Sequence, residues 1–149
     1  MSYLSASTKN PNKKNNLKYI NEPDNFYTHA IPALLVIPTT IFMASQVQGG
    51  TALFGALLYG ITMFMLFTAS SLYHGIPKTD EHRLFWKKMD HSCIFLMIAG
   101  AYTPLILLAF TGNTQLILLS YLWTVAIVGI AIKLSGKLQK GWVSLTIYL

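Results

Sequence analysis

The sequence predicts an all-α protein, a polytopic bundle of membrane-spanning helices. Hydrophobic residues make up 53% of the 149 positions and charged residues only 11%, whereas a soluble domain usually carries about 25% charged residues. The charges are bunched between long apolar runs, and such runs approach the length that a helix needs to cross about 30 Å of hydrocarbon. A chain of this kind has too little polar surface to cover a globule in water.

The amino-terminal part divides into a tail and the beginning of the bundle. Residues 1–21 are polar and lysine-bearing, without the apolar core of a secretory signal, so we predict a flexible tail followed by a transmembrane bundle over 22–149. The first span covers about 30–47 and contains Pro32 and Pro38. Because neighbouring helices must satisfy the carbonyls that a proline frees in lipid, we expect a packed, kinked helix there.

Three further spans follow, separated by polar segments. The second, over about 51–73, carries no charge, and a charged connector over 74–91 comes next. The connector mixes Trp and apolar residues with lysines, which favours a short helix lying in the headgroup region. The third and fourth spans cover about 92–111 and 114–132. The apolar run over 142–149 is too short to cross a bilayer, so we expect it to begin a fifth span in a longer protein.

The basic residues predict the orientation. All eleven Lys and Arg residues fall in the tail, in the connector or after the fourth span, and the two intervening turns contain none. An even number of spans separates these segments, so they lie on one side of the membrane. The positive-inside rule makes that side cytoplasmic. The sequence therefore predicts a multi-pass protein of the cell membrane with its amino terminus in the cytoplasm.

Ser70 and His74 are the first candidates for chemistry. Their i, i+4 spacing puts both on one face of the second span near its cytoplasmic end. A neutral imidazole there can ligate a metal, with the hydroxyl orienting it or holding a bound water. The alternative is a histidine that reaches into the headgroups, with Ser70 bonded back to its own helix.

Asp90 stands at the predicted start of the third span and also has two interpretations. An acid at a helix N-terminus can cap the helix and complement its dipole. Alternatively, its carboxylate faces into the bundle, where it holds a metal-bound water or moves a proton, since ionisable groups at membrane depth usually face partners rather than lipid.

The stretch EPDNFYTH leads into the first span. Glu22, Asn25 and His29 recur at helical spacing, i, i+3 and i+7, and can form a polar stripe on one face. The alternative is that Glu22 and Asp24 only favour a helix start, as acids in a first turn do.

These motifs resemble those of the bacterial hemolysin III family, part of the wider progestin and adipoQ receptor group and distantly similar to alkaline ceramidases. The similarity covers nearly the whole chain from residue 20 onward and includes the stretch MDHSCIFLMIAGAYTP around Asp90. The other matching residues form E-x2-N-x2-T-H and S-x3-H motifs: Glu22, Asn25, Thr28, His29, Ser70 and His74.

The resemblance implies seven helices, a place in the bacterial inner membrane and a zinc site. His74 would be one zinc ligand, two more would come from an H-x3-H in the seventh span, and Asp90 and Ser70 would support the zinc-bound water. Glu22, Asn25, Thr28 and His29 would be motif residues packed near the site. This sequence contains no H-x3-H, and zinc needs at least three protein ligands. Either a longer form completes the zinc site or the site has been lost.

Three functions remain open at this point. The resemblance implies a channel-forming, cytolytic protein, although no span shows a polar stripe wide enough to line a pore. A second function is a zinc-dependent hydrolase of lipid amide or ester bonds, in which Asp90 takes a proton from the metal-bound water. A third is a non-enzymatic membrane sensor or homeostasis protein. The expected partners are the lipid bilayer and a lipid substrate, and no nucleic acid.

Overall fold

The computed structural model describes residues 20–76 and 79–135, and it confirms the all-α prediction in these ranges. Four helices follow one another: α1 Pro23–Gln46, α2 Gly50–Gly75, α3 Asp80–Ala109 and α4 Gly112–Leu134. Each is long and apolar enough to cross a membrane. The run at 142–149, predicted to begin a fifth span, lies outside the described residues.

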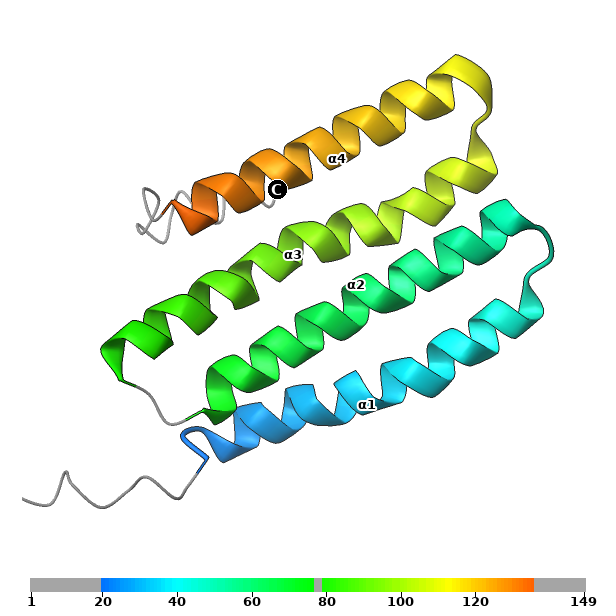
Figure 1. Ribbon diagram of the computed structural model, residues 1–149. Helices are drawn as coiled ribbons and strands as arrows, with labels where there is room; N and C mark the ends of the chain where they lie inside the picture. Colours follow the sequence, from blue (N-terminus) through cyan, green and yellow to red (C-terminus); the bar gives the residue numbers. More distant parts are fainter. Residues whose placement is uncertain (1–19, 77–78, 136–149) are drawn as a thin grey trace, which may run out of the picture.

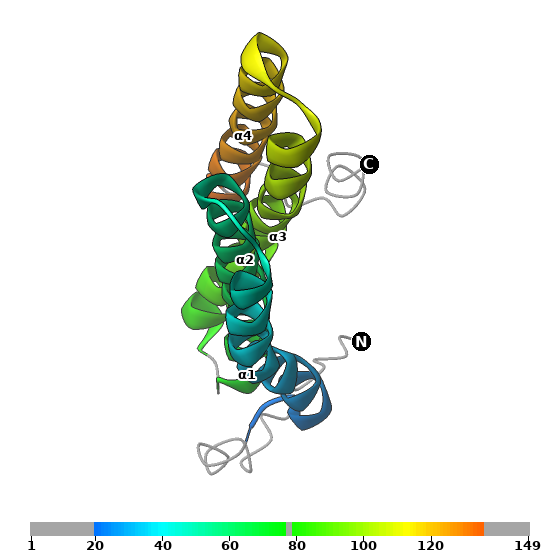
Figure 2. The same ribbon diagram turned by 90° about the vertical axis from the view of Figure 1, so that its right-hand side faces the viewer.

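The four helices form one layer in chain order. Each helix packs against its neighbour in the sequence, α1 on α2, α2 on α3 and α3 on α4, and Figures 1 and 2 show the layer from two sides. Neighbours are antiparallel, because the turns between them are short. The start of α1, the end of α2, the start of α3 and the end of α4 therefore lie at one end of the layer, which we call the connector end. The tight turns lie at the opposite end.

Glycine and threonine set several helix boundaries. Gly49 (φ 87°) precedes α2 and Gly112 (φ 62°) begins α4, a backbone conformation that other residues adopt only with strain. Thr79 caps α3, because its side chain accepts a hydrogen bond from the backbone N–H of His82 at 3.4 Å. Gly49 thus lies in the turn between α1 and α2.

Small residues bring the helices together. Thr40 of α1 packs directly on Gly60 of α2, and Thr62 of α2 packs in the same way on Gly100 of α3, so that a Cβ at either glycine would overlap the threonine side chain. Lipid tails are as apolar as leucine, so helices in a bilayer associate through such close packing rather than through a hydrophobic driving force. These two contacts also fix how far each helix is shifted along its neighbour.

The connector predicted over 74–91 is mostly helical. His74 belongs to α2, which ends at Gly75, and α3 already begins at Asp80. The prediction of a separate short helix in the headgroup region is wrong. With 30 residues, α3 is about 45 Å long, against about 30 Å of hydrocarbon. Its first turns therefore extend beyond the hydrocarbon as a continuation of the span.

Candidate functional site: a histidine cluster at the connector end

Four polar residues from α2, from α1 and from the position just before α1 meet at the connector end. We call Glu22, Asn25, His29 and His74 the boundary cluster. Glu22 directly precedes α1, whose first residue is Pro23, and proline suits this position because its fixed φ is already helical. The backbone N–H of Glu22 donates to the carbonyl oxygen of His74 at 3.1 Å. The start of α1 is thereby attached to the last turn of α2.

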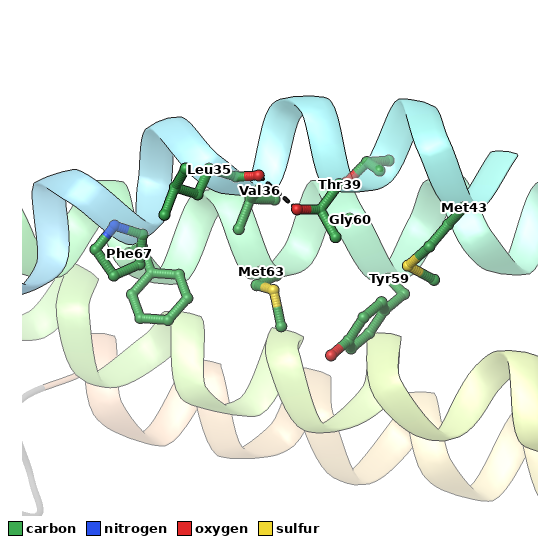
Figure 3. Close-up of a pocket in the computed structure, with 10 residues that line it drawn as sticks. Leu35, Val36, Thr39, Met43, Tyr59, Gly60, Met63 and Phe67 are labelled. Atoms are coloured by element: carbon green, nitrogen blue, oxygen red, sulfur yellow. Dashed lines mark hydrogen bonds between the residues drawn. The ribbon is translucent and has the colours of Figure 1, made fainter. Parts of the chain in front are cut away.

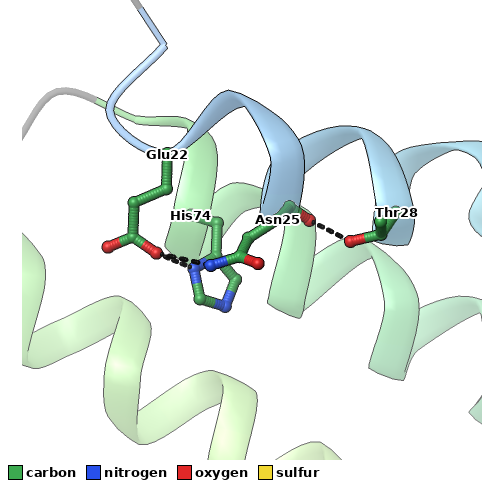
Figure 4. A network of polar contacts seen from close by, with 4 residues as sticks. All are labelled: Glu22, Asn25, Thr28 and His74. Atoms are coloured by element: carbon green, nitrogen blue, oxygen red, sulfur yellow. Dashed lines mark hydrogen bonds and ion pairs between the residues drawn. The ribbon is translucent and has the colours of Figure 1, made fainter.

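The side chains of the same two residues form the centre of the cluster. Oε2 of Glu22 lies 2.7 Å from Nδ1 of His74, and Nδ2 of Asn25 donates to that carboxylate oxygen at 2.9 Å (Figure 4). The side chain of His74 is 19% exposed and that of Glu22 39% exposed. Asn25 thus fixes the position of the Glu22 carboxylate, and the carboxylate fixes the orientation of the His74 imidazole.

This contact selects one tautomer of His74. An ionised carboxylate can only accept hydrogen bonds, so the ring nitrogen facing Glu22 carries the proton. In the neutral imidazole the other nitrogen, Nε2, then keeps its lone pair, and it points away from Glu22 (Figure 4). A histidine oriented in this way by a carboxylate can take up a proton or ligate a metal through Nε2.

His29 adds a second imidazole to the cluster. Its ring lies parallel to that of His74, with centroids 5.7 Å apart and an interplanar angle of 8°. Nδ1 of His29 is buried, and no hydrogen-bond partner for it is found among the described residues. Thr28 instead bonds locally, since its hydroxyl donates to the carbonyl oxygen of Asn25 at 2.9 Å. The polar stripe predicted along Glu22, Asn25 and His29 is present, and it faces His74.

Ser70 and Asp90 lie near the cluster without joining it. Because Gly100 of α3 meets Thr62 of α2 and the two helices are antiparallel, Asp90 is about level with residue 72, within one turn of His74. Ser70 is buried, with 6% exposure, one turn before His74. No side-chain hydrogen bond of Ser70 or Asp90 is found within the described residues.

Two alternative interpretations of the acids are wrong. Asp90 cannot cap α3, because the helix begins ten residues earlier at Asp80 and its cap is Thr79. Glu22 does more than favour a helix start, since its carboxylate reaches His74 and makes no capping hydrogen bond to α1. The direct pair between Glu22 and His74 was not predicted. The signal for it was the placement of both residues at the same predicted membrane boundary.

Three buried polar atoms at this end lack a partner among the described residues. They are Nδ1 of His29 and the hydroxyls of Thr68 and Ser92. By the same antiparallel alignment, Ser92 is about level with Ser70. Buried polar groups are usually hydrogen-bonded. This end of the layer can therefore accept a further hydrogen-bonding group, such as water or the polar part of a substrate.

An apolar groove runs along α1 and α2 away from the cluster. Residues 63, 67, 70 and 74 follow one another at helical spacing, so the groove and His74 share one face of α2. The groove has a volume of ≈ 210 Å³ (Figure 3). Thr39 lines the groove, but its hydroxyl is used within its own helix, where it donates to the carbonyl oxygen of Leu35 at 2.7 Å. The lining residues are Pro32, Leu35, Val36, Thr39, Thr40, Met43, Tyr59, Gly60, Met63 and Phe67.

The described residues do not by themselves form a zinc site. No group of three His, Cys, Asp or Glu side chains that could hold a metal ion occurs within 20–76 and 79–135. His74 offers one nitrogen, and a protein zinc site needs three or more ligands. The donor set found here therefore does not fit zinc without further ligands.

Comparison with known proteins matches most of the chain to one family. The family model described as Haemolysin-III related matches residues 17–149. Hemolysin-3 of Bacillus cereus is 40% identical over 113 residues, which are 74% of this chain and 51% of that protein. The Hemolysin-3 homolog of Bacillus subtilis (strain 168) is 32% identical over 113 residues, 74% of this chain and 53% of that protein. The chain thus spans about half the length of these relatives, and no solved structure matches it.

Proposed function

The chain belongs to the haemolysin III-related family of multi-pass membrane proteins, and from that premise we propose that its boundary cluster is a hydrolytic centre. The substrate class is a membrane lipid with an amide or ester bond. The observation that carries the proposal is the 2.7 Å contact between Glu22 and His74. It gives one imidazole a fixed tautomer and leaves Nε2 directed away from the carboxylate.

The chemistry follows from this geometry. Nε2 of His74 accepts a proton from a water molecule as the water oxygen attacks the lipid carbonyl carbon. Glu22 stabilises the imidazolium that forms, because its carboxylate already faces Nδ1. The imidazolium then returns the proton to the amine or alcohol that leaves when the carbon–nitrogen or carbon–oxygen bond breaks. Asp90 and Ser70, at the same depth, are proposed to hold the water.

The groove supports a lipid as the substrate. It lies on the same face of α2 as His74, is apolar, and extends along α1, a helix long and apolar enough to cross a membrane. An acyl chain can lie in it while the carbonyl group stays at the cluster. The distribution of Lys and Arg further supports a cytoplasmic amino terminus. The boundary cluster would then lie at the cytoplasmic side of the plasma membrane.

Zinc is a separate proposal and an alternative to the imidazole chemistry, because a zinc ion would occupy the same Nε2 lone pair of His74. His74 is the residue that can ligate it, and the carboxylate behind the imidazole is the arrangement usual for ligating histidines. The remaining ligands would have to come from outside the described residues. Metal analysis of the purified protein tests this point, with bound zinc expected in the wild type and lost in His74→Ala. Wild-type protein without zinc would contradict the metal proposal and leave the imidazole chemistry standing.

The hydrolytic proposal is tested by measuring fatty acid release from lipid nanodiscs that contain the full chain. The nanodiscs carry lipids with amide-linked or ester-linked acyl chains, and mass spectrometry detects the products. We expect release by the wild type and loss of release in His74→Ala. The matched control is His82→Ala, because His82 is an exposed histidine at the same end of the layer. Absence of release from the wild type, or equal release from both variants, would refute the proposal.

A cytolytic, channel-forming activity is the second candidate. The relatives bear the name Hemolysin-3, and the single layer of helices leaves large apolar side chains exposed on all four spans. Such faces suit assembly into a larger structure. Dye release from liposomes tests it, and liposomes that stay sealed at high protein-to-lipid ratio would refute it. If neither hydrolysis nor leakage occurs, the non-enzymatic sensor is the proposal that stands.

A further inference from the structure

The apolar groove along α1 and α2 begins at the boundary cluster. Phe67 lines its near end, and the ring of His29 lies beside that of Phe67 and parallel to that of His74, with centroids 6.1 Å and 5.7 Å apart. Pro32, the first lining residue of α1, follows His29 by about one helical turn. The cluster and the groove are therefore continuous, and a molecule bound at Nε2 of His74 can extend into the groove.

The far end of the groove lies beyond the middle of the bilayer. Figure 3 shows Phe67 at one end, Met43 and Tyr59 at the other, and Met63 between them. Along the axis of α2, Tyr59 is about 22 Å from His74, at about 1.5 Å per residue. One leaflet contributes about 15 Å of hydrocarbon, half of the total. An acyl chain that starts at the cluster must therefore be long and extended to reach Tyr59.

The volume of the groove matches the outer half of such a chain. An engineered apolar cavity of about 150 Å³ binds benzene, so ≈ 210 Å³ holds about eight carbon atoms. The groove runs for about 12 Å from the level of Phe67 to that of Tyr59. At the same spacing of carbons, the distance of about 22 Å from His74 to Tyr59 takes about fifteen carbons, close to a palmitoyl chain. The described residues that line the groove include no charged side chain, as an acyl chain requires.

The floor of the groove is fixed, whereas its wall depends on individual side chains. Thr40 packs directly on Gly60, so α1 and α2 touch at the floor, and Val36 is buried, with 6% exposure. Met63 lines the middle with a flexible side chain that adapts to its neighbours. Tyr59 ends the groove with a rigid aromatic ring. A larger side chain at position 63 would shorten the groove, and a smaller one at position 59 would lengthen it.

We propose that the groove selects the substrate by the length of its acyl chain, and that Met63 and Tyr59 set this length. The inference deepens the proposed hydrolysis and rests on it for the reaction, although binding of the chain does not require hydrolysis. A chain that ends at Tyr59 fills the groove. A shorter chain leaves the far part of the groove empty, and a longer chain must leave the groove to pass the ring of Tyr59.

Competition between two lipids in nanodiscs that contain the full chain tests this selection. The nanodiscs carry equal amounts of phospholipids with ester-linked palmitoyl and lauroyl chains, and mass spectrometry measures the ratio of the released fatty acids. We expect the wild type to favour palmitic acid and Met63→Trp to lower the palmitic-to-lauric ratio about tenfold, since a mismatch of one methylene in an apolar pocket already has an effect of this size. Tyr59→Ala should instead raise the release of arachidic acid relative to palmitic acid from a matching mixture. Met65→Trp is the matched control, because Met65 is 40% exposed and does not line the groove.

Binding of the chain is measured separately from hydrolysis. Native mass spectrometry compares palmitic and lauric acid on His74→Ala, which lacks the proposed base, and on the same protein with Met63→Trp added. We expect palmitic acid to bind more tightly to His74→Ala, because its chain reaches the end of the groove. The preference should be lost in the double variant, because the indole blocks the middle of the groove.

The outcomes distinguish the two proposals. Release with an unchanged palmitic-to-lauric ratio in Met63→Trp would overturn selection by length and leave the hydrolytic proposal standing. Absence of release together with the expected binding preference would refute hydrolysis and keep the groove as a length-selective site. Equal binding of the two acids to His74→Ala would overturn the inference. So would an equal change of the ratio in Met65→Trp and Met63→Trp, because a bulky residue outside the groove would then act like one inside it.

Discussion

The two ends of the helix layer are built from different chemistry. At the connector end, side chains reach neighbouring elements: Glu22 pairs with His74, and Lys88 donates to the backbone carbonyl oxygen of Leu134 at the end of α4. At the opposite end, Gly49 and Gly112 turn the chain, and Gln115 donates to two carbonyls of the preceding hairpin arm. The contacts at the opposite end close turns, whereas the contacts at the connector end orient ionisable side chains. The difference predicts that the proposed hydrolysis is sensitive to substitutions at one end only.

Glu22→Gln should have the largest effect among variants that keep the shape of the cluster. The amide can still contact His74, but it no longer requires a proton on Nδ1 and does not stabilise an imidazolium. We expect fatty acid release to fall about 10–100-fold, as for other groups that orient a functional histidine. Asp24→Asn, which removes an acid from the exposed first turn of α1, is the control. Equal loss in the two variants would mean that only the charge near α1 matters.

Gly100→Ala tests the packing on which the depth of Asp90 depends. A Cβ at this position overlaps Thr62, so we expect a loss of about 1–3 kcal/mol in the free energy of unfolding, measured in detergent, as for overpacked cores. Adding Thr62→Ala should restore part of it. Gly50→Ala serves as control because a Cβ there meets nothing within 4 Å. Unchanged stability of Gly100→Ala would contradict the close approach of α2 and α3.

Thr103→Val tests a hydrogen bond between α3 and α4 near the middle of the layer. The hydroxyl of Thr103 accepts from Nε1 of Trp123 at 3.1 Å and donates to the carbonyl oxygen of Ala99 at 2.6 Å. Thr103→Val leaves the indole N–H without this acceptor, which should cost about 1–2 kcal/mol of stability. Hydrolysis should be unaffected. Thr124→Val, whose hydroxyl bonds only within α4, is expected to be neutral.

Gln115→Ala should have the smallest effect and provides the counterpart of Glu22→Gln at the other end. Its side-chain amide donates to the carbonyl oxygens of Leu107 and Phe110 at 3.1 and 2.7 Å. Losing these bonds should lower the free energy of unfolding by only about 1 kcal/mol, because the freed carbonyls lie at the turn, where water can donate hydrogen bonds to them. Fatty acid release per folded molecule should stay the same. A loss of release comparable to that of Glu22→Gln would remove the distinction between the two ends.

The sequence predicted the helices well because lipid leaves a chain few choices. Uncharged runs near 20 residues must be helical in a bilayer, so the spans were found by length and charge alone. Their ends were less predictable. Residues 80–91 looked like a separate element because their composition changes, yet nothing in that segment stops a helix, and Thr79 provides the start signal.

The candidate site was predictable in its members and less so in its contacts. Helical spacing identified the stripe on α1 and the place of His74. The pairing with Glu22 depends on how far α1 is shifted along α2, and that shift is set by Thr40 on Gly60 and by Phe26 on Gly75. Such packing depends on shape rather than on residue pattern. Residues 80–91 looked like a separate element, so we predicted the start of α3 too late in the chain and Asp90 at a helix start.

The tautomer of His74 tests the central claim most directly. The chain has four histidines, so nitrogen NMR of protein labelled at histidine and reconstituted in bilayers can resolve them, with His74→Gln to assign the signal. The geometry predicts a proton on Nδ1 and a lone pair on Nε2, with the signal changing in Glu22→Gln. A proton on Nε2, or a ring that averages both forms and is unaffected by Glu22→Gln, would show that the carboxylate does not orient this imidazole.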